Sequence, residues 1–115
     1  MFKKLRTVIY HADDIRKAKE WYALATGIQP YFDEAFYVGF DVNGCELGLD
    51  PDIKGVREGN NAVAYWSVDG MPAVLEKLVA AGASVVKEIA YVGGGISVSE
   101  IKDPFGNTLG LIEGA

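Results

Sequence analysis

The chain has 115 residues, half of them hydrophobic, and a formal net charge of −5 at neutral pH. A chain of this length folds as one domain, and its apolar fraction excludes an intrinsically disordered protein. Binding to phosphates requires clustered Lys and Arg, but here acidic residues outnumber them 16 to 11. The charge therefore argues against nucleic acid and against an anionic membrane as partners.

The first half of the chain predicts one helix among four strands. A strand is expected at residues 5–12, and Asp13 or Asp14 can cap the helix that follows. Gly27 ends this helix; further strands are expected at 29–32, 36–42 and 45–50. The pair Asn43-Gly44 is typical of a two-residue hairpin turn between the last two of these strands. The buried stripe of the helix is predicted from helical spacing as Ile15, Ala18, Trp21, Tyr22 and Ala25.

The second half repeats this order after a polar linker expected at residues 51–61. A strand is predicted at 62–68, then a helix with Asp69 as its cap and Pro72 in its first turn. The helix stops at Gly82, and strands follow at 84–91, 96–102 and 108–112. The run Gly93 to Gly95 is expected to be a flexible join. The buried stripe of this helix is predicted as Met71, Val74, Leu75, Leu78 and Ala81.

Two glycine pairs suggest that the halves are copies of one unit. Gly44 and Gly106 are 62 residues apart (106 − 44), as are Gly48 and Gly110 (110 − 48). One β-α-β-β-β unit has too few strands to cover its own face. The sequence thus predicts one α+β domain over 1–115, with βαβββ modules at about 5–50 and 62–113. We expect these modules to form a curved mixed sheet with a central cleft, and the helices to lie on its outer face.

The element order, the length and the turn Asp103-Pro104-Phe105-Gly106-Asn107 resemble the vicinal oxygen chelate superfamily. This superfamily contains glyoxalase I, bleomycin-resistance proteins and extradiol dioxygenases, and the resemblance extends from about residue 5 to residue 113. Metal-binding members carry His, Glu or Gln at the start of the first strand and in the last strand of each half. By the resemblance, these positions are Thr7, Gly48, Val63 and Gly110 here.

The resemblance therefore implies a domain that lacks the usual metal ligands, and no cofactor is expected. His11 is the only histidine, so one chain cannot build a site that needs two histidines and a carboxylate. A displaced metal site made from His11, Glu46 and Glu100 is a remaining alternative, although metal ligands normally need supporting partners.

Strand alternation selects the candidate ligand-binding residues. His11 lies four residues after Thr7 and so on the same face, which the resemblance makes the cavity face. There it could carry a proton, or it could be an ordinary edge histidine bonded locally. Glu46 is likewise a candidate general base or a solvated strand residue. The full set of candidates is Ile9, His11, Tyr37, Glu46, Tyr65, Ser67, Tyr91 and Glu100.

The facing of Glu100 is open at this stage. If Val38 and Phe40 face the first helix, the 62-residue offset places Glu100 and Lys102 against the second helix, where charges are unfavourable. Either the gap differs in the second half, or that strand has a bulge. Tyr37 and Tyr91 are equally compatible with the cleft and with the core or rim.

The preferred hypothesis is metal-independent binding or sequestration of a small molecule, cationic or aromatic, in the cleft. One alternative is a superfamily enzyme of isomerase, lyase or dioxygenase type, acting on a small oxygenated substrate. Another is a regulatory or pairing module without a ligand. A homodimer is expected because the sheet edges look unprotected. A single cysteine, Cys45, and the lack of an apolar run of about 20 residues or a secretory signal favour a cytoplasmic protein.

Overall fold

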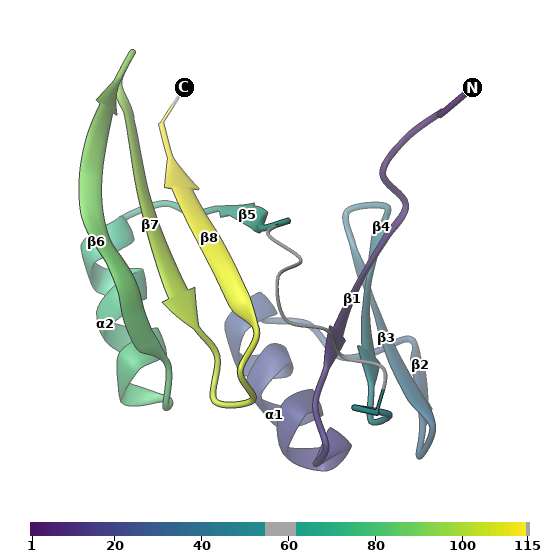
Figure 1. Cartoon of the computed structure of the whole chain (residues 1–115). Coiled ribbons are helices and arrows are strands. Elements are labelled where there is room, and N and C mark those ends of the chain that lie inside the picture. The colour runs from purple at the N-terminus through teal and green to yellow at the C-terminus, as the bar shows by residue number, and fades with distance from the viewer. Residues whose placement is uncertain (55–61, 115) are drawn as a thin grey trace. The chain divides into compact units, whose positions relative to one another are not determined.

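The computed structural model describes residues 1–54 and 62–114, and it divides into two compact units, Met1–Glu58 and Gly59–Ala115. Within the described residues, each unit has one helix and one four-stranded sheet (Figure 1). The predicted α+β class and the repeated β-α-β-β-β order are confirmed. Residues 55–61 of the predicted linker lie outside the described residues.

In unit 1 the sheet has the strand order β1-β4-β3-β2, with β1 parallel to β4 and the other pairs antiparallel. One face of this sheet packs against α1 and supplies the core of the unit. The buried residues there come from all three long strands and from the helix. The elements are β1 (Thr7–His11), α1 (Ile15–Thr26), β2 (Phe32–Glu34), β3 (Tyr37–Val42) and β4 (Cys45–Asp50).

Helix α1 begins and ends as its sequence predicts. The carboxylate of Asp14 accepts a hydrogen bond from the backbone N–H of Lys17 at 3.1 Å, which satisfies one of the unpaired donors of the first turn. Gly27 takes the left-handed conformation (φ 74°) that ends the helix. Ala18, Trp21 and Tyr22 are buried. The predicted stripe is too long by one turn, because Ala25 is exposed.

The second strand lies later in the chain than predicted, at Phe32–Glu34 rather than at 29–32. The residue before it, Tyr31, still donates its N–H to the carbonyl of Gly39 at 3.0 Å. The turn falls on Ala35 and Phe36. Asp33 and Glu34, which lie between the strands predicted at 29–32 and 36–42, therefore belong to β2 and not to a loop. The hairpin at Asn43-Gly44 is confirmed, with positive φ at both residues (51° and 89°).

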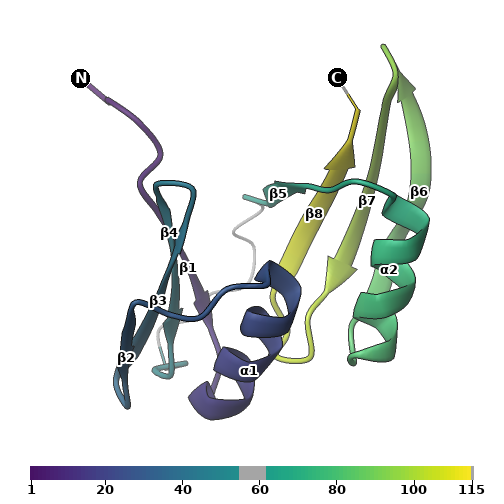
Figure 2. The ribbon, with the colours of Figure 1, turned by 180° about the vertical axis from the view of Figure 1, so that it is seen from behind.

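In unit 2 the strand order is β5-β8-β7-β6, the same arrangement as in unit 1. Helix α2 lies against one face of this sheet (Figure 2). Strand β6 forms an edge of the sheet, its pairing with β7 is interrupted by register shifts, and its residues 84–92 are exposed. The elements are β5 (Ala64–Ser67), α2 (Met71–Ala80), β6 (Ser84–Gly93), β7 (Ile96–Lys102) and β8 (Thr108–Glu113).

The cap of α2 differs from the prediction. Gly70, rather than Asp69, is the N-cap residue, and no side chain at that position caps the helix. Instead the carboxylate of Glu113 on β8 accepts hydrogen bonds from the N–H groups of Gly70 at 2.5 Å and Met71 at 2.9 Å. These bonds lower the pKa of Glu113 below its ordinary value. The last strand of the unit thus fixes the start of its helix.

The turn between β7 and β8 is organised by Asp103, which is 4% exposed. Its side chain accepts hydrogen bonds from the N–H groups of Phe105 at 2.9 Å and Asn107 at 2.8 Å, and from the side-chain amide of Asn107 at 2.9 Å. A buried carboxylate needs such donors. The side chain of Asp103 therefore stabilises the turn that the sequence predicts.

This turn also resolves the facing of Glu100. Four residues separate the paired Asp41 and Glu46 in unit 1, whereas five separate the paired Lys102 and Thr108 in unit 2. The extra residue shifts the alternation of side chains along β7 by one residue relative to unit 1. As a result, Glu100 lies on the face away from α2. Ser99 and Ile101 take the buried positions instead.

No helix among the residues described has the length and apolar character to cross a membrane.

Candidate functional site

Each sheet has an open face, which we define as the face opposite its helix. Strand pairing assigns the residues of the open face of unit 1, because directly paired residues point to the same side. The pairs are Thr7 with Glu46, Ile9 with Gly48, His11 with Asp50, Gly39 with Gly48 and Asp41 with Glu46. The open face of unit 1 therefore holds three of the predicted site residues on β1 and β4.

Glu46 is the centre of a hydrogen-bonded group on this face. Its Oε2 accepts a hydrogen bond from the hydroxyl of Tyr37 at 2.6 Å, and its Oε1 accepts one from the hydroxyl of Tyr31. Both carboxylate oxygens are thus oriented by phenols. Beside them lies a hollow of about 410 Å³, open to solvent and lined by Arg6, Tyr31, Asp41, Gly44 and Glu46.

Tyr37 owes its position to Gly48. A Cβ built on this glycine would overlap the phenolic oxygen of Tyr37 and lie 2.6 Å from its Cζ, so the ring lies directly over the glycine. Burial raises the pKa of Tyr37, and the negative charge of Asp50 raises it further. Both effects favour the protonated phenol, which donates the hydrogen bond to the carboxylate of Glu46. The ring of Phe32 lies beside it, with the centroids 6.2 Å apart.

His11 lies on the same open face but at its other end. Its register partner is Asp50, whereas Glu46 pairs with Thr7, four residues earlier. At about 3.3 Å per residue this is roughly 13 Å along the strand. The Nδ1 of His11 lies 3.0 Å from the carbonyl oxygen of Asp52, to which a protonated Nδ1 donates. His11 and Glu46 therefore cannot act together on one small group of atoms.

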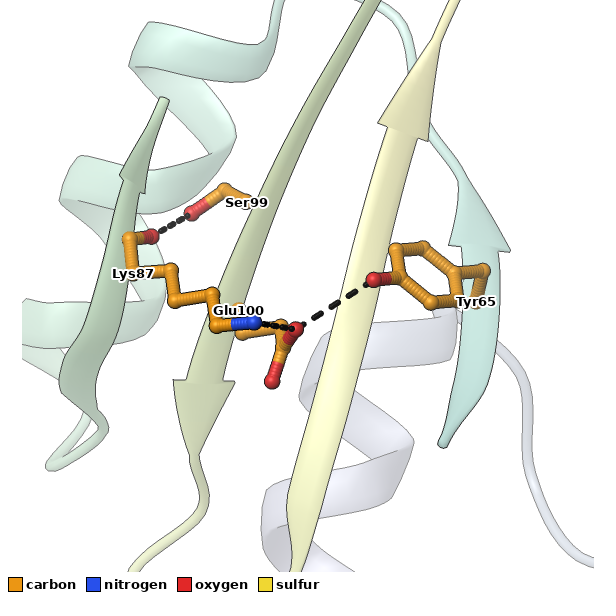
Figure 3. Close-up of polar contacts among 4 residues, drawn as sticks. All are labelled: Tyr65, Lys87, Ser99 and Glu100. Carbon is orange, nitrogen blue, oxygen red and sulfur yellow. Dashed lines mark hydrogen bonds and ion pairs between the residues drawn. The ribbon is translucent and has the colours of Figure 1, made fainter. Parts of the chain in front are cut away.

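The open face of unit 2 has a related arrangement, in which Tyr65 and Glu100 point toward each other (Figure 3). A Cβ on Gly110 would lie 2.5 Å from the ring of Tyr65, which is its direct strand partner. The hydroxyl of Tyr65 points over β8 to Oε2 of Glu100 at 3.3 Å, a long hydrogen bond. The same oxygen lies 3.2 Å from Nζ of Lys87. Ser99 points the other way and donates to the carbonyl of Lys87 at 2.8 Å.

The two tyrosines come from strands that do not correspond. Gly48 pairs with Ile9 on β1 and Gly39 on β3, while Gly110 pairs with Tyr65 on β5 and Glu100 on β7. Tyr65 therefore occupies the place of Ile9. Tyr37 reaches its glycine from β3, two residues before Gly39.

Two further predicted residues lie in unit 2. Ser67 pairs with Ile112 and so belongs to the open face. Tyr91 pairs with Ser97, which shares its side of the sheet with Ser99, so its register places it on the helix side. Its hydroxyl accepts a hydrogen bond from the N–H of Gly95 at 3.0 Å in the β6–β7 turn. The structure does not bring Tyr91 to the face of Tyr65 and Glu100.

The sequence of residues 4–111 matches the family described as the Glyoxalase/Bleomycin resistance protein/Dioxygenase superfamily. The chain belongs to this superfamily. The resemblance found in the sequence is thereby confirmed for nearly the whole chain. A comparison with curated proteins finds no match.

Solved structures agree with this membership at the level of fold. A glyoxalase/bleomycin resistance protein/dioxygenase family enzyme from Burkholderia phytofirmans has a TM-score of 0.81 at 18% identity, with 96% of this chain and 98% of that one covered. A glyoxalase-related enzyme from Fulvimarina pelagi has 0.78 at 17%, with 98% and 89% covered. The fosfomycin resistance protein FosX from Listeria monocytogenes has 0.81 at 14%, with 100% and 96% covered.

The metal that this superfamily can imply does not fit the side chains present. The four positions assigned to its ligands hold Thr7, Gly48, Val63 and Gly110, which offer one hydroxyl and no imidazole or carboxylate. Both glycines are covered by tyrosine rings. Among the residues described, no group of three or more His, Cys, Asp and Glu side chains is placed to hold a metal ion.

Several residues of these faces were not foreseen from the sequence. Tyr31 follows a proline within the strand predicted at 29–32 and lies just before the observed strand β2, and Lys87 gave no signal beyond its alternation along β6. The coverage of Gly48 by Tyr37 depends on a ring that leans across to a neighbouring strand.

A larger hollow, of about 610 Å³, lies between the start of α1 and β2. Its lining contains no predicted site residue and consists of Asp13, Asp14, Ile15, Arg16, Lys19, Asp33, Glu34, Ala35 and Val38.

Proposed function

We propose that this protein binds a small molecule on the open faces of its sheets without using a metal ion. The observation that carries the proposal is the coverage of Gly48 and Gly110 by tyrosine rings, at the two strand positions where metal-binding relatives place a donor. A face that presents phenols and carboxylates can recognise a ligand by hydrogen bonding and stacking alone.

The chemistry of unit 1 favours an organic cation with an aromatic part. Tyr31 is 64% exposed and Phe32 38% exposed, so their rings are available for stacking. Glu46 contributes a negative charge, and no ion pair to it occurs within the described part of the chain. Aromatic rings and a carboxylate together attract cations, at about 0.5–2 kcal/mol for each cation–π contact. The net charge of −5 supports the same preference.

The experiment combines a metal assay with a ligand screen. The purified protein is incubated with Zn²⁺, Ni²⁺, Mn²⁺ and Fe²⁺, desalted and analysed for metal content, and is then screened by thermal shift with aromatic cations and their neutral and anionic analogues. We expect no stoichiometric metal and a rise in Tm with cations. Retention of one metal ion per chain would contradict the proposal, as would a screen without any ligand.

A second candidate is an enzyme of the same superfamily that works without the usual metal ligands. The alignment of Glu46 by two phenols beside an open hollow favours it, because a fixed carboxylate can act as a general base. The similarity in fold to FosX is compatible with this candidate but does not extend to its substrate. Turnover of a small oxygenated substrate that Glu46→Gln abolishes would favour the enzyme over a binding protein.

We further propose that the protein is a cytoplasmic homodimer. The support for pairing is the exposed edge strand β6, which carries Val85, Val86, Ile89, Tyr91 and Val92 with exposed fractions of 36–69%. Such an edge offers unpaired backbone groups together with apolar side chains.

A further inference from the structure

The loss of metal-binding donors could in principle be reversed by replacing two glycines. The geometry around Gly48 opposes this. A side chain at Gly48 would have to begin in the space that the phenol of Tyr37 already fills, since its Cβ alone would overlap the phenolic oxygen. Likewise, a Cβ on Gly110 would lie 2.5–2.6 Å from three ring atoms of Tyr65. Real Cβ atoms do not approach other atoms so closely.

Neither tyrosine is free to move aside without loss. The hydroxyl of Tyr37 is bonded to Glu46 at 2.6 Å, and its ring packs beside Phe32. Tyr65 is bonded to Glu100, which in turn pairs with Lys87. Displacing a ring therefore breaks a hydrogen bond to a charged group.

We propose that Tyr37 and Tyr65 take the room of the superfamily's metal ligands and close both open faces to metal. The inference rests on the proposed metal-free function and adds its structural cause. The metal-binding side chains are absent, and in addition the tyrosine rings fill the space that such side chains would need. Each phenol then becomes the polar group at the centre of its face. Tyr37 and Tyr65 are accordingly specificity-determining residues for whatever binds there.

Unit 1 allows this closure to be tested within a single sheet. Thr7 is the direct partner of Glu46, and Gly48 lies two residues further along the same strand and on the same face. The double substitution Thr7→His and Gly48→Glu therefore places an imidazole and a second carboxylate beside Glu46. This is a donor set suited to Ni²⁺.

The test compares Ni²⁺ binding by calorimetry in two forms of this double variant. With Tyr37 retained, we expect binding at least tenfold weaker than with the added change Tyr37→Ala, which frees the space over position 48. Phe36→Ala is the matched control, since it removes an exposed ring of the same hairpin that does not cover the glycine. It should leave the weak binding unchanged. Equal Ni²⁺ affinity with and without Tyr37 would overturn the proposal.

A second measurement guards against variants that fail to fold. Urea unfolding is compared for Gly48→Ala in the presence of Tyr37 and in the Tyr37→Ala background. We expect the alanine to lower the unfolding midpoint with Tyr37 present, and to be neutral or favourable without it. Equal effects in the two backgrounds would refute the closure. Stoichiometric metal in the unchanged protein would instead refute the proposed function, so the two failures are distinguishable.

Discussion

Tyr65 lies with its ring over Gly110, the residue it faces across the β5–β8 pair, and the glycine has no room for a Cβ. The contact joins the first and last strands of unit 2, which are far apart in sequence. It also carries the phenol to within 3.3 Å of Glu100 on the next strand. The absence of a Cβ at Gly110 thus determines where the hydroxyl of Tyr65 lies on the open face.

Gly110→Ala should lower the free energy of unfolding by about 1–3 kcal/mol, the usual cost of overpacking a close contact. The measurement is urea unfolding followed by circular dichroism. Gly39→Ala is the control, because its Cβ would come no closer than 3.2 Å to another side chain, at the flexible end of Glu46, and would lie 3.4 Å from the ring of Tyr31. A loss at Gly110 no larger than the loss at Gly39 would contradict the predicted role of Tyr65.

Tyr37 should ionise at higher pH than an ordinary tyrosine, whose pKa is 10.0, because burial and then the charge of Asp50 oppose its negative form. The folded state then holds the proton more tightly than the unfolded state does. The resulting stabilisation is complete below pH 10 and is lost as the pH rises through the folded pKa. NMR titration of ¹³C-labelled tyrosine should show a late-titrating ring that disappears in Tyr37→Phe. In Asp50→Asn its pKa should fall, and an unchanged value would refute this coupling.

Glu113 should make the start of α2 sensitive to acid. Its pKa is lowered by the N–H groups of Met71 and Gly70, so the folded state favours the charged carboxylate. The associated stability is present above the ordinary glutamate pKa of 4.5 and is lost as the pH falls through the lower folded value. Glu113→Ala should therefore reduce Tm at pH 7 by more than at pH 3. Asp69→Ala, at the position that the sequence predicts as the cap, should have little effect at either pH.

Asp103→Ala should be among the most damaging substitutions outside the apolar core. It removes the acceptor for three hydrogen bonds that are made by partly buried donors of Phe105 and Asn107. Each donor left unsatisfied costs about 1–3 kcal/mol. Thermal unfolding should show a drop much larger than that of Asp13→Ala, an exposed aspartate in the loop before α1. Similar Tm values for the two variants would exclude Asp103 as the organiser of the turn.

The proposed homodimer predicts a single species of twice the chain mass at micromolar concentration in sedimentation velocity. If β6 forms the contact, Val86→Lys should shift the protein toward monomer, since it places a charge on an exposed apolar edge. Lys3→Glu, far along the chain from β6, serves as the control for a change of charge. A monomer in the unchanged protein would contradict the proposal.

The sequence was most informative where one residue determines a local conformation. Asn43-Gly44 and the turn at Asp103 were predicted correctly, because positive φ and side-chain capping are short-range effects. Period-two alternation likewise placed Ile9 and Tyr65 on the open faces. Such features require no knowledge of distant parts of the chain.

Prediction failed where a distant partner replaced a local one. Asp69 is a reasonable cap by sequence, but Glu113, 44 residues away (113 − 69), takes that role. The 62-residue offset left the facing of Glu100 open, because one extra residue in a turn is invisible to a comparison of glycines. The pairing of Glu46 with Tyr31 and Tyr37 depends on side-chain directions across a hairpin, which spacing alone does not determine.

The two covering tyrosines lie on strands that are not equivalent in the internal repeat. Tyr37 belongs to β3 and Tyr65 to β5. The position equivalent to Tyr65 in unit 1 is Ile9, as the pairing with Gly48 shows. The two units therefore share the arrangement of their backbones, but the ring that shields the equivalent glycine comes from a different strand in each. The internal symmetry of the chain relates its strands and not its side-chain covers.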